Sequence, residues 1–331
     1  MNSGTPEPRG IRTGRAVTPP RPVDVVALFP ELAAHARTTV RLHPVPADPG
    51  PHDSSVGGPP AWPADEPWPT CPGGRHLGEG TAGSEGCPLL PVLQVHARDL
   101  PWYGGFPAGT DVLQLLWCPF QHFYADPAAR SDQWIADRTA PYNGVAGPWV
   151  QVRHRRSGGP AERLLTAPPR PAVLGSPHYL PTPCLLRPEP VTEYPHPGVL
   201  GEEFEARVEA WERANFADPD DPDEYDPRYS WEFSVAPGWK LGGHEPWNYQ
   251  GYDGPVRCGA CGCGMRFVAA LASAEWDGGG PSWKPVVHGA EAGAGRKQEH
   301  EPTGIVLGDW ETMRVFVCSR SADHPVVSDL K

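Results

Sequence analysis

The chain has 331 residues and a formal net charge of −12, and glycine (38) and proline (45) are abundant. The charge disfavours a nucleic-acid partner, because binding a phosphate backbone needs a concentrated basic surface. Glycine and proline at this level are typical of disordered chains, but 13 tryptophans are not, since disordered segments are poor in aromatic residues. We therefore expect a folded protein with short elements and long Pro/Gly loops.

The N-terminal segment, residues 1–22, is basic and proline-rich and lacks a hydrophobic run, so it predicts a disordered tail rather than a secretory signal. No apolar stretch approaches the roughly 18 residues that would suggest a membrane span. We accordingly expect a cytoplasmic monomer that does not enter a membrane. In a reducing compartment the eight cysteines are better suited to metal binding than to structural disulfides.

The first half of the ordered chain contains one short helix followed by strands. Residues 30–37 favour a helix that begins at Pro30, and residues 38–42 alternate in the manner of a strand. Residues 43–86 have the composition of a loop, and strands are predicted at 89–96 and 111–118. Weaker strand signals follow at 149–153 and 179–186.

The clearest helix is predicted over residues 201–216, where apolar residues form one stripe. An acidic loop follows at 218–226, and it lacks the ligand spacing of a calcium loop. We interpret this loop as a solvated segment, with a site for a cation or basic peptide as the alternative. The residues of the predicted stripe are Leu200, Phe204, Val208 and Trp211.

Three features occur twice in the same order. A Gly-Gly turn ending in tryptophan occupies 57–62 and 242–247, a cysteine with an apolar run occupies 87–95 and 263–271, and a second apolar run ends in cysteine at 118 and 318. The offsets are 185, 176 and 200 residues, a drift that loop insertions would produce. This pattern predicts an internal duplication. The repeats are residues 23–123 and 231–331, and residues 124–230 form an insertion with a linking helix.

The strongest chemical signal is Cys258-Gly-Ala-Cys261, a knuckle whose backbone N–H groups can face two thiolates. Zinc prefers four ligands, and Cys318 with Cys263 or His324 could complete the set. A redox-active cysteine pair and inert cysteines are the alternatives, although the βαβ context of a thioredoxin motif is absent. We expect structural zinc bound here.

The first half offers a looser version of this site. Cys71, Cys87 and Cys118 could combine with His76 or His122, but 15 residues separate the first two cysteines. We therefore expect this half to have lost its metal. Cys184 stands alone, and we assign it a buried apolar role.

The two Gly-Gly turns have a structural and a functional interpretation. Glycine pairs allow a tight turn that Trp62 and Trp247 could cover, as corners that stabilise the fold. Alternatively, the two tryptophans, with the side-chain amides of Gln94 and Gln250, could form a surface that binds an extended peptide.

Residues 55–63 with 88–95, and residues 241–250, resemble the YwqG-like family of bacterial proteins of uncharacterised function. More distantly, residues 258–267 with 315–318 are similar to the repeat of eukaryotic programmed-cell-death-2-like proteins, a group that contains dedicated chaperones of a ribosomal protein. The resemblance covers roughly residues 40–120 and 230–325. The second half departs from the family pattern at 269–271, where a glutamine such as Gln94 is frequent, and a terminal cysteine pair is reduced to Cys318 with His324 as a stand-in.

The resemblance implies an α+β, β-rich fold with an internally duplicated YwqG-like sheet unit. It also implies a non-enzymatic, chaperone-like module that holds a protein client and contains a structural zinc site. A zinc-dependent hydrolase is the first alternative, but it needs an open metal position and a general base, and the sequence has no His-Glu-x-x-His or Gly-x-Ser-x-Gly motif. An immunity protein that neutralises a toxin is the second.

Overall fold

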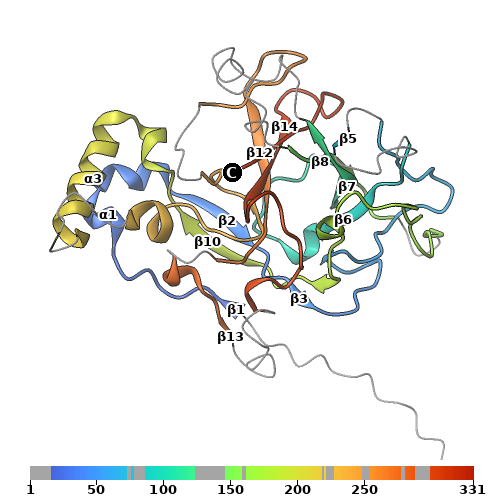
Figure 1. Cartoon of the computed structure of the whole chain (residues 1–331), viewed down its shortest axis with the longest axis horizontal. Coiled ribbons are helices and arrows are strands. Elements are labelled where there is room, and N and C mark those ends of the chain that lie inside the picture. Colours follow the sequence, from blue (N-terminus) through green and yellow to red (C-terminus); the bar gives the residue numbers. More distant parts are fainter. Residues whose placement is uncertain are drawn as a thin grey trace, which may run out of the picture.

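The fold is described from a computed structural model (Figure 1). The residues that the structure describes are 16–72, 76–77, 86–123, 146–158, 162–217, 220, 227–247, 254–276, 280–287 and 299–331. Most of the tail predicted at 1–22 and of the acidic loop predicted at 218–226 lies outside these ranges, as does Gln250. Within the described residues, no helix is both long enough and apolar enough to cross a membrane.

The chain forms a β-rich α+β fold, as the sequence predicts, and most of its strands lie in two large antiparallel sheets. The first sheet has the order β3-β9-β4-β6-β7-β5, and β8 also pairs with β7. Its strands are β3 (Val45–Pro46), β4 (Ser55–Val56), β5 (His76–Leu77), β6 (Leu90–His96), β7 (Val112–Phe123), β8 (Ala146–Arg155) and β9 (Cys184–Leu185).

The second sheet has the order β10-β2-β11-β12-β14-β15. A separate two-stranded ribbon joins β1 (Ala16–Val17) to β13 (Val286–Val287). The strands of the second sheet are β2 (Arg37–Arg41), β10 (Glu189–Glu193), β11 (Lys240–Gly242), β12 (Met265–Ala272), β14 (Thr312–Cys318) and β15 (Val327–Leu330).

Two α-helices and the longest 3-10 helix of the described residues gather at one end of the molecule (Figure 1). They are α1 (Val25–Leu28), a 3-10 helix (Pro30–His35) and α3 (Glu202–Phe216). The predicted stripe of α3 is confirmed: Phe204 and Val208 are buried, and Trp211 packs against the same cluster. A π-helical turn (Tyr229–Phe233) completes this end, with Tyr229 and Phe233 buried beside α3.

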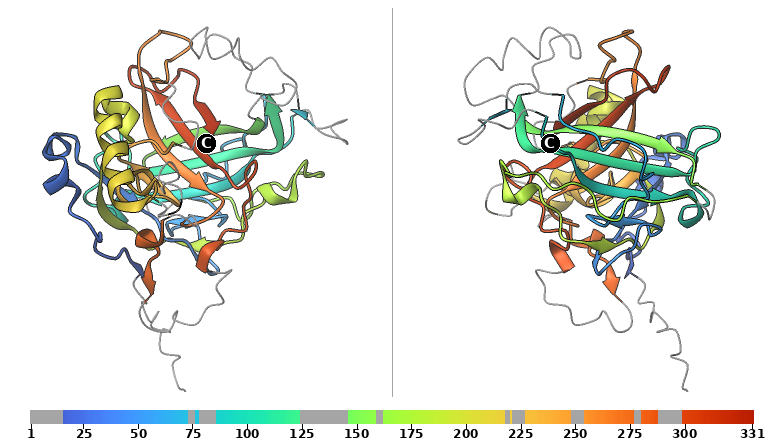
Figure 2. Two further views of the ribbon diagram at one scale, coloured as in Figure 1. Left: turned by 60° about the vertical axis from the view of Figure 1, so that its left-hand side comes forward. Right: turned by 90° about the vertical axis from the view of Figure 1, so that its right-hand side faces the viewer.

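The main hydrophobic core draws residues from both sheets, which pack against one another (Figure 2). Val95 and Leu115 come from the first sheet, and Val268 and Val315 from the second. The segments assigned above to two repeats and an insertion are interleaved, because β2 lies in the second sheet and β8 and β9 lie in the first. Burial of this shared apolar surface is the main term that holds the two sheets together.

The three central strands follow the same order in both sheets. β4, β6 and β7 are neighbours in the first sheet, and β11, β12 and β14 are neighbours in the second. Each middle strand has a register irregularity against the next strand, between Pro91 and Leu93 in β6 and between Phe267 and Ala269 in β12. These positions differ by 176 residues, the offset found between the two apolar runs.

The Gly-Gly turns also match. Gly57 follows β4 and Gly242 ends β11, and each has a φ of +64°, a conformation that favours glycine. Gln114 Nε2 donates to the carbonyl of Ala61 at 3.0 Å, and Arg314, 200 positions later, donates to the carbonyl of Pro246 at 3.4 Å. Duplication of an ancestral unit remains our interpretation of these equivalences.

Candidate metal centres and adjoining pockets

The second metal centre, defined by Cys258, Cys261, Cys318 and His324, is built on a tight hairpin. The Cys258 N–H donates to the carbonyl of Cys263 at 2.9 Å, and the Gly262 N–H donates to that of Cys258 at 2.7 Å. Gly262 takes a φ of +68°, which allows the chain to reverse between the cysteines. Because β12 and β14 are antiparallel, with Met265 opposite Cys318, the end of β14 lies beside this hairpin.

The ligand atoms of these four residues all lie within 4.8 Å of one another. The Sγ atoms of Cys261 and Cys318 are 3.6 Å apart, and His324 Nδ1 lies 3.2 Å from Cys318 Sγ and 3.6 Å from Cys258 Sγ. Tetrahedral Zn–S bonds of about 2.3 Å place sulfur atoms about 3.8 Å apart, so these separations suit one ion. All five predicted ligands gather here, since Cys263 Sγ is 3.2 Å from Cys261 Sγ.

Backbone dipoles favour thiolates at two of these positions. Burial opposes ionisation of Cys318, but N–H groups of Arg320 and Ser321 outweigh it and lower the pKa to about 7. Burial likewise opposes ionisation of Cys258, and the N–H groups of Ala260 and Cys261 lower its pKa. Cys258 and Cys318 are therefore the members of the centre that ionise most readily, whereas neighbouring cysteines and burial raise the pKa of Cys261 to about 12.

The first metal centre is defined by Cys71, His76, Cys87 and Cys118, whose ligand atoms also lie within 4.8 Å of one another. Cys87 Sγ is 3.6 Å from Cys118 Sγ, and His76 Nε2 is 3.4 Å from the Sγ atoms of both Cys71 and Cys118. His122 Nε2, 3.5 Å from Cys71 Sγ, is a further nitrogen beside this set. A complete set of four possible ligands is therefore present in this half, which argues against the expectation that it has lost its metal.

Strand pairing brings the widely spaced cysteines of the first centre together. The Cys71 N–H donates to the carbonyl of Cys87 at 2.8 Å, as the Cys258 N–H does to that of Cys263. Cys71 and Cys118 are almost fully buried, and proximity to Cys71 followed by burial raises the pKa of Cys118. A divalent cation would reverse this protonation, because a coordinated thiol is deprotonated.

No disulfide joins the eight cysteines, all of which lie in the described part of the chain. Cys184 is buried in the main core, where its thiol donates to the carbonyl of Pro302 and burial raises its pKa to about 12. The apolar role assigned to Cys184 agrees with this position. The other seven cysteines lie in or beside the two metal centres.

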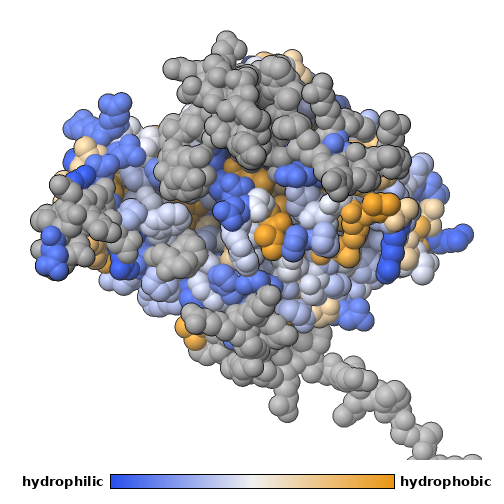
Figure 3. Space-filling model, viewed as in Figure 1, coloured by the Kyte–Doolittle hydropathy of each residue, from blue (hydrophilic) through white to orange (hydrophobic). Residues whose placement is uncertain are grey.

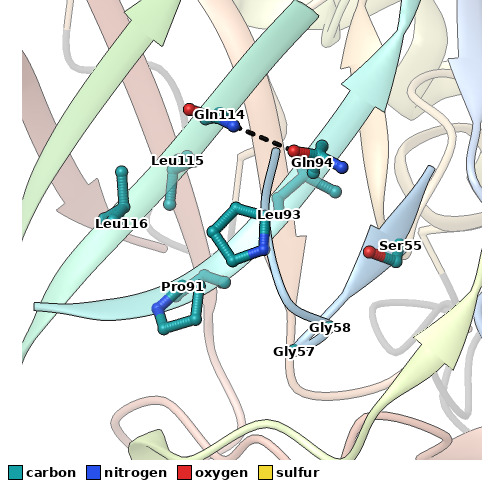
Figure 4. A pocket seen from close by; sticks show the side chains of 11 residues that line it. Ser55, Gly57, Gly58, Pro91, Leu93, Gln94, Gln114, Leu115 and Leu116 are labelled. Atoms are coloured by element: carbon teal, nitrogen blue, oxygen red, sulfur yellow. Dashed lines mark hydrogen bonds between the residues drawn. The ribbon is translucent and has the colours of Figure 1, made fainter. Parts of the chain in front are cut away.

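The first Gly-Gly turn lies beside the hydrogen-bonded side chains of Gln94 and Gln114 (Figure 4). The Gln94 Oε1 accepts hydrogen bonds from the Ala61 N–H at 2.7 Å and from Gln114 Nε2 at 2.9 Å. Trp62 is fully buried, and the Arg155 guanidinium stacks 3.9 Å from its ring centroid. Trp62 and Gln94 therefore stabilise the turn, and because both side chains are buried they present almost no surface to an extended peptide.

The second Gly-Gly turn lies beside an open cavity of about 370 Å³. Trp247 is half-buried, with the Arg314 guanidinium 4.1 Å from its ring centroid. Trp231 from the π-helical turn and Trp310 line the same cavity, hereafter the tryptophan pocket. Trp310 is 51% exposed and takes a φ of +65°, a conformation that is rare for an aromatic residue and occurs at turns and at functional sites.

A third cavity, hereafter the basic pocket, has a volume of about 310 Å³ and lies at the corresponding end of the first sheet. Its lining includes three arginines, two histidines and one glutamate: Arg98, Arg155, Arg156, His52, His96 and Glu162. Sequence patterns point to Trp247 in the tryptophan pocket but not to the arginines of the basic pocket, because the pocket walls come from segments far apart along the chain. A comparison with protein-family models finds no match, and a search of curated proteins finds none either.

Proposed function

We propose that this chain is a non-enzymatic binding protein that holds a segment of a protein client and contains two structural zinc centres. The observation that carries the proposal is the pair of centres, each with three thiols and one imidazole within 4.8 Å. Thiol and imidazole donors in a tetrahedral set are characteristic of zinc, whereas calcium and magnesium prefer oxygen ligands.

The position of each centre supports a structural role. In each centre, the cysteines that precede a central strand lie close to a cysteine of the next strand. This last cysteine is Cys118 in β7 and Cys318 in β14. Four protein ligands complete the zinc shell and leave no position for a catalytic water. A zinc hydrolase needs such an open position, so this geometry favours binding over catalysis.

Metal content tests the zinc part of the proposal. Protein purified without chelator should contain two zinc ions per chain by elemental analysis. Cys118→Ser and Cys318→Ser should each remove one ion, and Cys184→Ser, which alters a buried cysteine outside both centres, should remove none. Wild-type protein without zinc would overturn the zinc proposal, and a Cys258–Cys261 disulfide found by mass spectrometry would support the redox alternative.

The tryptophan pocket is the best-supported site for a client. It combines Trp231, Trp247 and Trp310 with the carboxylates of Asp309 and Glu311. On the face shown in Figure 3, apolar side chains gather over the sheets, and hydrophilic side chains dominate the helical end. Aromatic rings beside carboxylates suit a segment with apolar and basic side chains, and the net charge of −12 favours a basic client.

Client binding can be tested with two exposed tryptophans. Trp310 lies in the tryptophan pocket and Trp102 outside it, with exposed fractions of 51% and 43%. A protein partner would be identified by co-purification from native cells, and its basic, apolar segments would be synthesised as peptides. Trp310→Ala should abolish peptide binding, and Trp102→Ala should preserve it. Equal binding by both variants would remove the pocket from the proposal.

The resemblance to YwqG-like and programmed-cell-death-2-like proteins supports a chaperone-like role, and it rests on the motifs alone. The identity of the partner separates this role from that of an immunity protein. A ribosomal or other housekeeping client would support the first, and a toxin would support the second. Either outcome retains the binding function.

A further inference from the structure

The basic pocket is formed where β6, β7 and β8 end. His96 is the last residue of β6, Val112 the first of β7 and Arg155 the last of β8. The loops at residues 98, 156–158 and 162 complete its wall. Its volume of about 310 Å³ suits one small organic molecule.

The three arginines of the pocket differ in the partners they already have. Arg155 places its guanidinium on both carboxylate oxygens of Glu66, at 2.6 and 2.7 Å, so its charge is neutralised. The Arg98 side chain is 58% exposed, its Nε forms a long ion pair with Asp99 at 3.8 Å, and its Nη2 donates to the carbonyl of His52, which leaves its other N–H groups available. Arg156 is exposed, and within the described residues no carboxylate pairs with it. Two guanidinium groups therefore keep capacity for an anion, in a chain whose overall charge is −12.

His96 adds a buried imidazole to the wall of the pocket. Gln94 Oε1 faces the Ala61 N–H, so Gln94 Nε2 is the atom that lies 3.2 Å from His96 Nε2. The N–H groups of this amide also face the backbone carbonyls of Pro51 at 2.8 Å and Asp53 at 3.1 Å. The ring is only 3% exposed, and burial lowers the pKa of His96. The positive charge of the pocket therefore comes from its arginines.

The equivalent place in the second sheet has a different chemistry. Ala61 and Val112 line the basic pocket, and Pro246 and Thr312, offset by 185 and 200 residues, line the tryptophan pocket. Arg155 pairs with the start of β7, and the backbone of Lys331 pairs with Thr312 at the start of β14. The backbone frame is thus shared, but one pocket has arginines and histidines where the other has tryptophans and carboxylates. Such a difference indicates two distinct ligands.

We propose that the basic pocket binds a small molecule through a phosphate or carboxylate group held by Arg98 and Arg156. Guanidinium groups suit this task because their planar donors match the geometry of both oxyanions. Glu162 lies on the same wall, and its carboxylate favours a hydroxyl or ammonium group on the rest of the ligand. The site is independent of the metal centres and of the proposed client.

Titration calorimetry of the full chain with inorganic phosphate, and separately with acetate, tests the proposal and distinguishes the two oxyanions. Arg98→Gln and Arg156→Gln should each weaken binding by about tenfold or more, the effect of losing one charge-assisted hydrogen bond. Arg170→Gln is the matched control, because Arg170 is also exposed but does not line the pocket. Glu162→Gln should strengthen binding, since it removes a negative charge with little change of shape.

Three results would overturn this proposal. The first is that wild-type protein binds neither anion. The second is that Arg170→Gln weakens binding as much as Arg156→Gln. The third is that the arginine variants lose binding only because they unfold, while Glu162→Gln leaves the affinity unchanged. Thermal unfolding of each variant identifies the last case. Because the arginines are exposed, we expect unfolding temperatures within a few degrees of wild type.

Discussion

Cys263 Sγ lies 3.5 Å from Cys318 Sγ, although four other donors can already surround one ion at this centre. Cys261 and Cys263 therefore compete for one coordination position. The carbonyl of Cys263 accepts from the Cys258 N–H as that of Cys87, in the first centre, accepts from the Cys71 N–H, so Cys263 and Cys87 occupy equivalent backbone positions. The four ligand atoms that lie within 4.8 Å of one another, however, include Cys261 and not Cys263. The second centre combines the backbone of the first with an additional cysteine.

Serine substitutions distinguish these two ligands. We expect Cys261→Ser to reduce the metal content from two ions to one per chain, because it removes a member of the compact set. Cys263→Ser should retain both ions, and so should the control Cys184→Ser. Elemental analysis gives the stoichiometry. The opposite result, with the loss confined to Cys263→Ser, would show that the second centre follows the ligand pattern of the first.

Chelators should remove the two ions at different rates. Cys71 and Cys118 of the first centre are almost fully buried, whereas Cys261 of the second is partly exposed. A chelator needs access to the ion, so the second centre should release its metal first. A colorimetric zinc indicator should report two phases, and Cys318→Ser should eliminate the fast one. Persistence of the fast phase in Cys318→Ser would contradict this assignment.

The elements predicted from the sequence are those with a strong local pattern. The apolar runs that begin near Leu89 and Met265 form β6 and β12, and the stripe of α3 is buried as expected. The close spacing of Cys258 and Cys261 predicts the second metal centre. Local spacing does not predict the first metal centre, because the sheet sets the pairing of Cys71 with Cys87.

Charges buried inside the second sheet were also beyond the reach of sequence patterns. Lys240 lies in a short apolar strand, fully buried, and its Nζ contacts both carboxylate oxygens of Glu193, at 2.8 and 2.9 Å. Glu193 comes from β10, which is 47 residues away in sequence. An alternating pattern would place such residues at the surface, so only the pairing of distant strands explains their burial.

Acidification should destabilise the fold between pH 6.5 and 4. Burial lowers the pKa of His43, His154, His196 and His244 to about 4. A histidine with a lowered folded-state pKa stabilises the fold fully above its unfolded value of about 6.5, and this stability is lost as the pH falls through 4. Chemical denaturation across this range should therefore show decreasing free energy of unfolding toward low pH.

Glu275 should partly offset that loss. Burial raises its pKa to about 7, against the opposing influence of Arg41, so the folded state gains a proton between pH 7 and 4.5 that the unfolded state does not. Stability from this group is full below 4.5 and is lost as the pH rises through 7. Glu275→Gln removes the offset, and its unfolding free energy should fall more steeply on acidification than that of wild type. A shallower slope would contradict the protonated state inferred for Glu275.

Gly57 in the first Gly-Gly turn should resist substitution for two separable reasons. Gly57 has a φ of +64°, and a Cβ there would lie 3.0 Å from the Pro181 side chain and carbonyl oxygen. Gly86 has nearly the same φ of +65° with nothing within 4 Å, and Gly104 has open space without a positive φ. Gly86→Ala should therefore cost about 1–2 kcal/mol from backbone strain alone, Gly57→Ala should cost more, and Gly104→Ala should cost little. Free energies of unfolding from denaturant titrations would rank them, and equal losses at Gly57 and Gly104 would show that the corner tolerates a side chain.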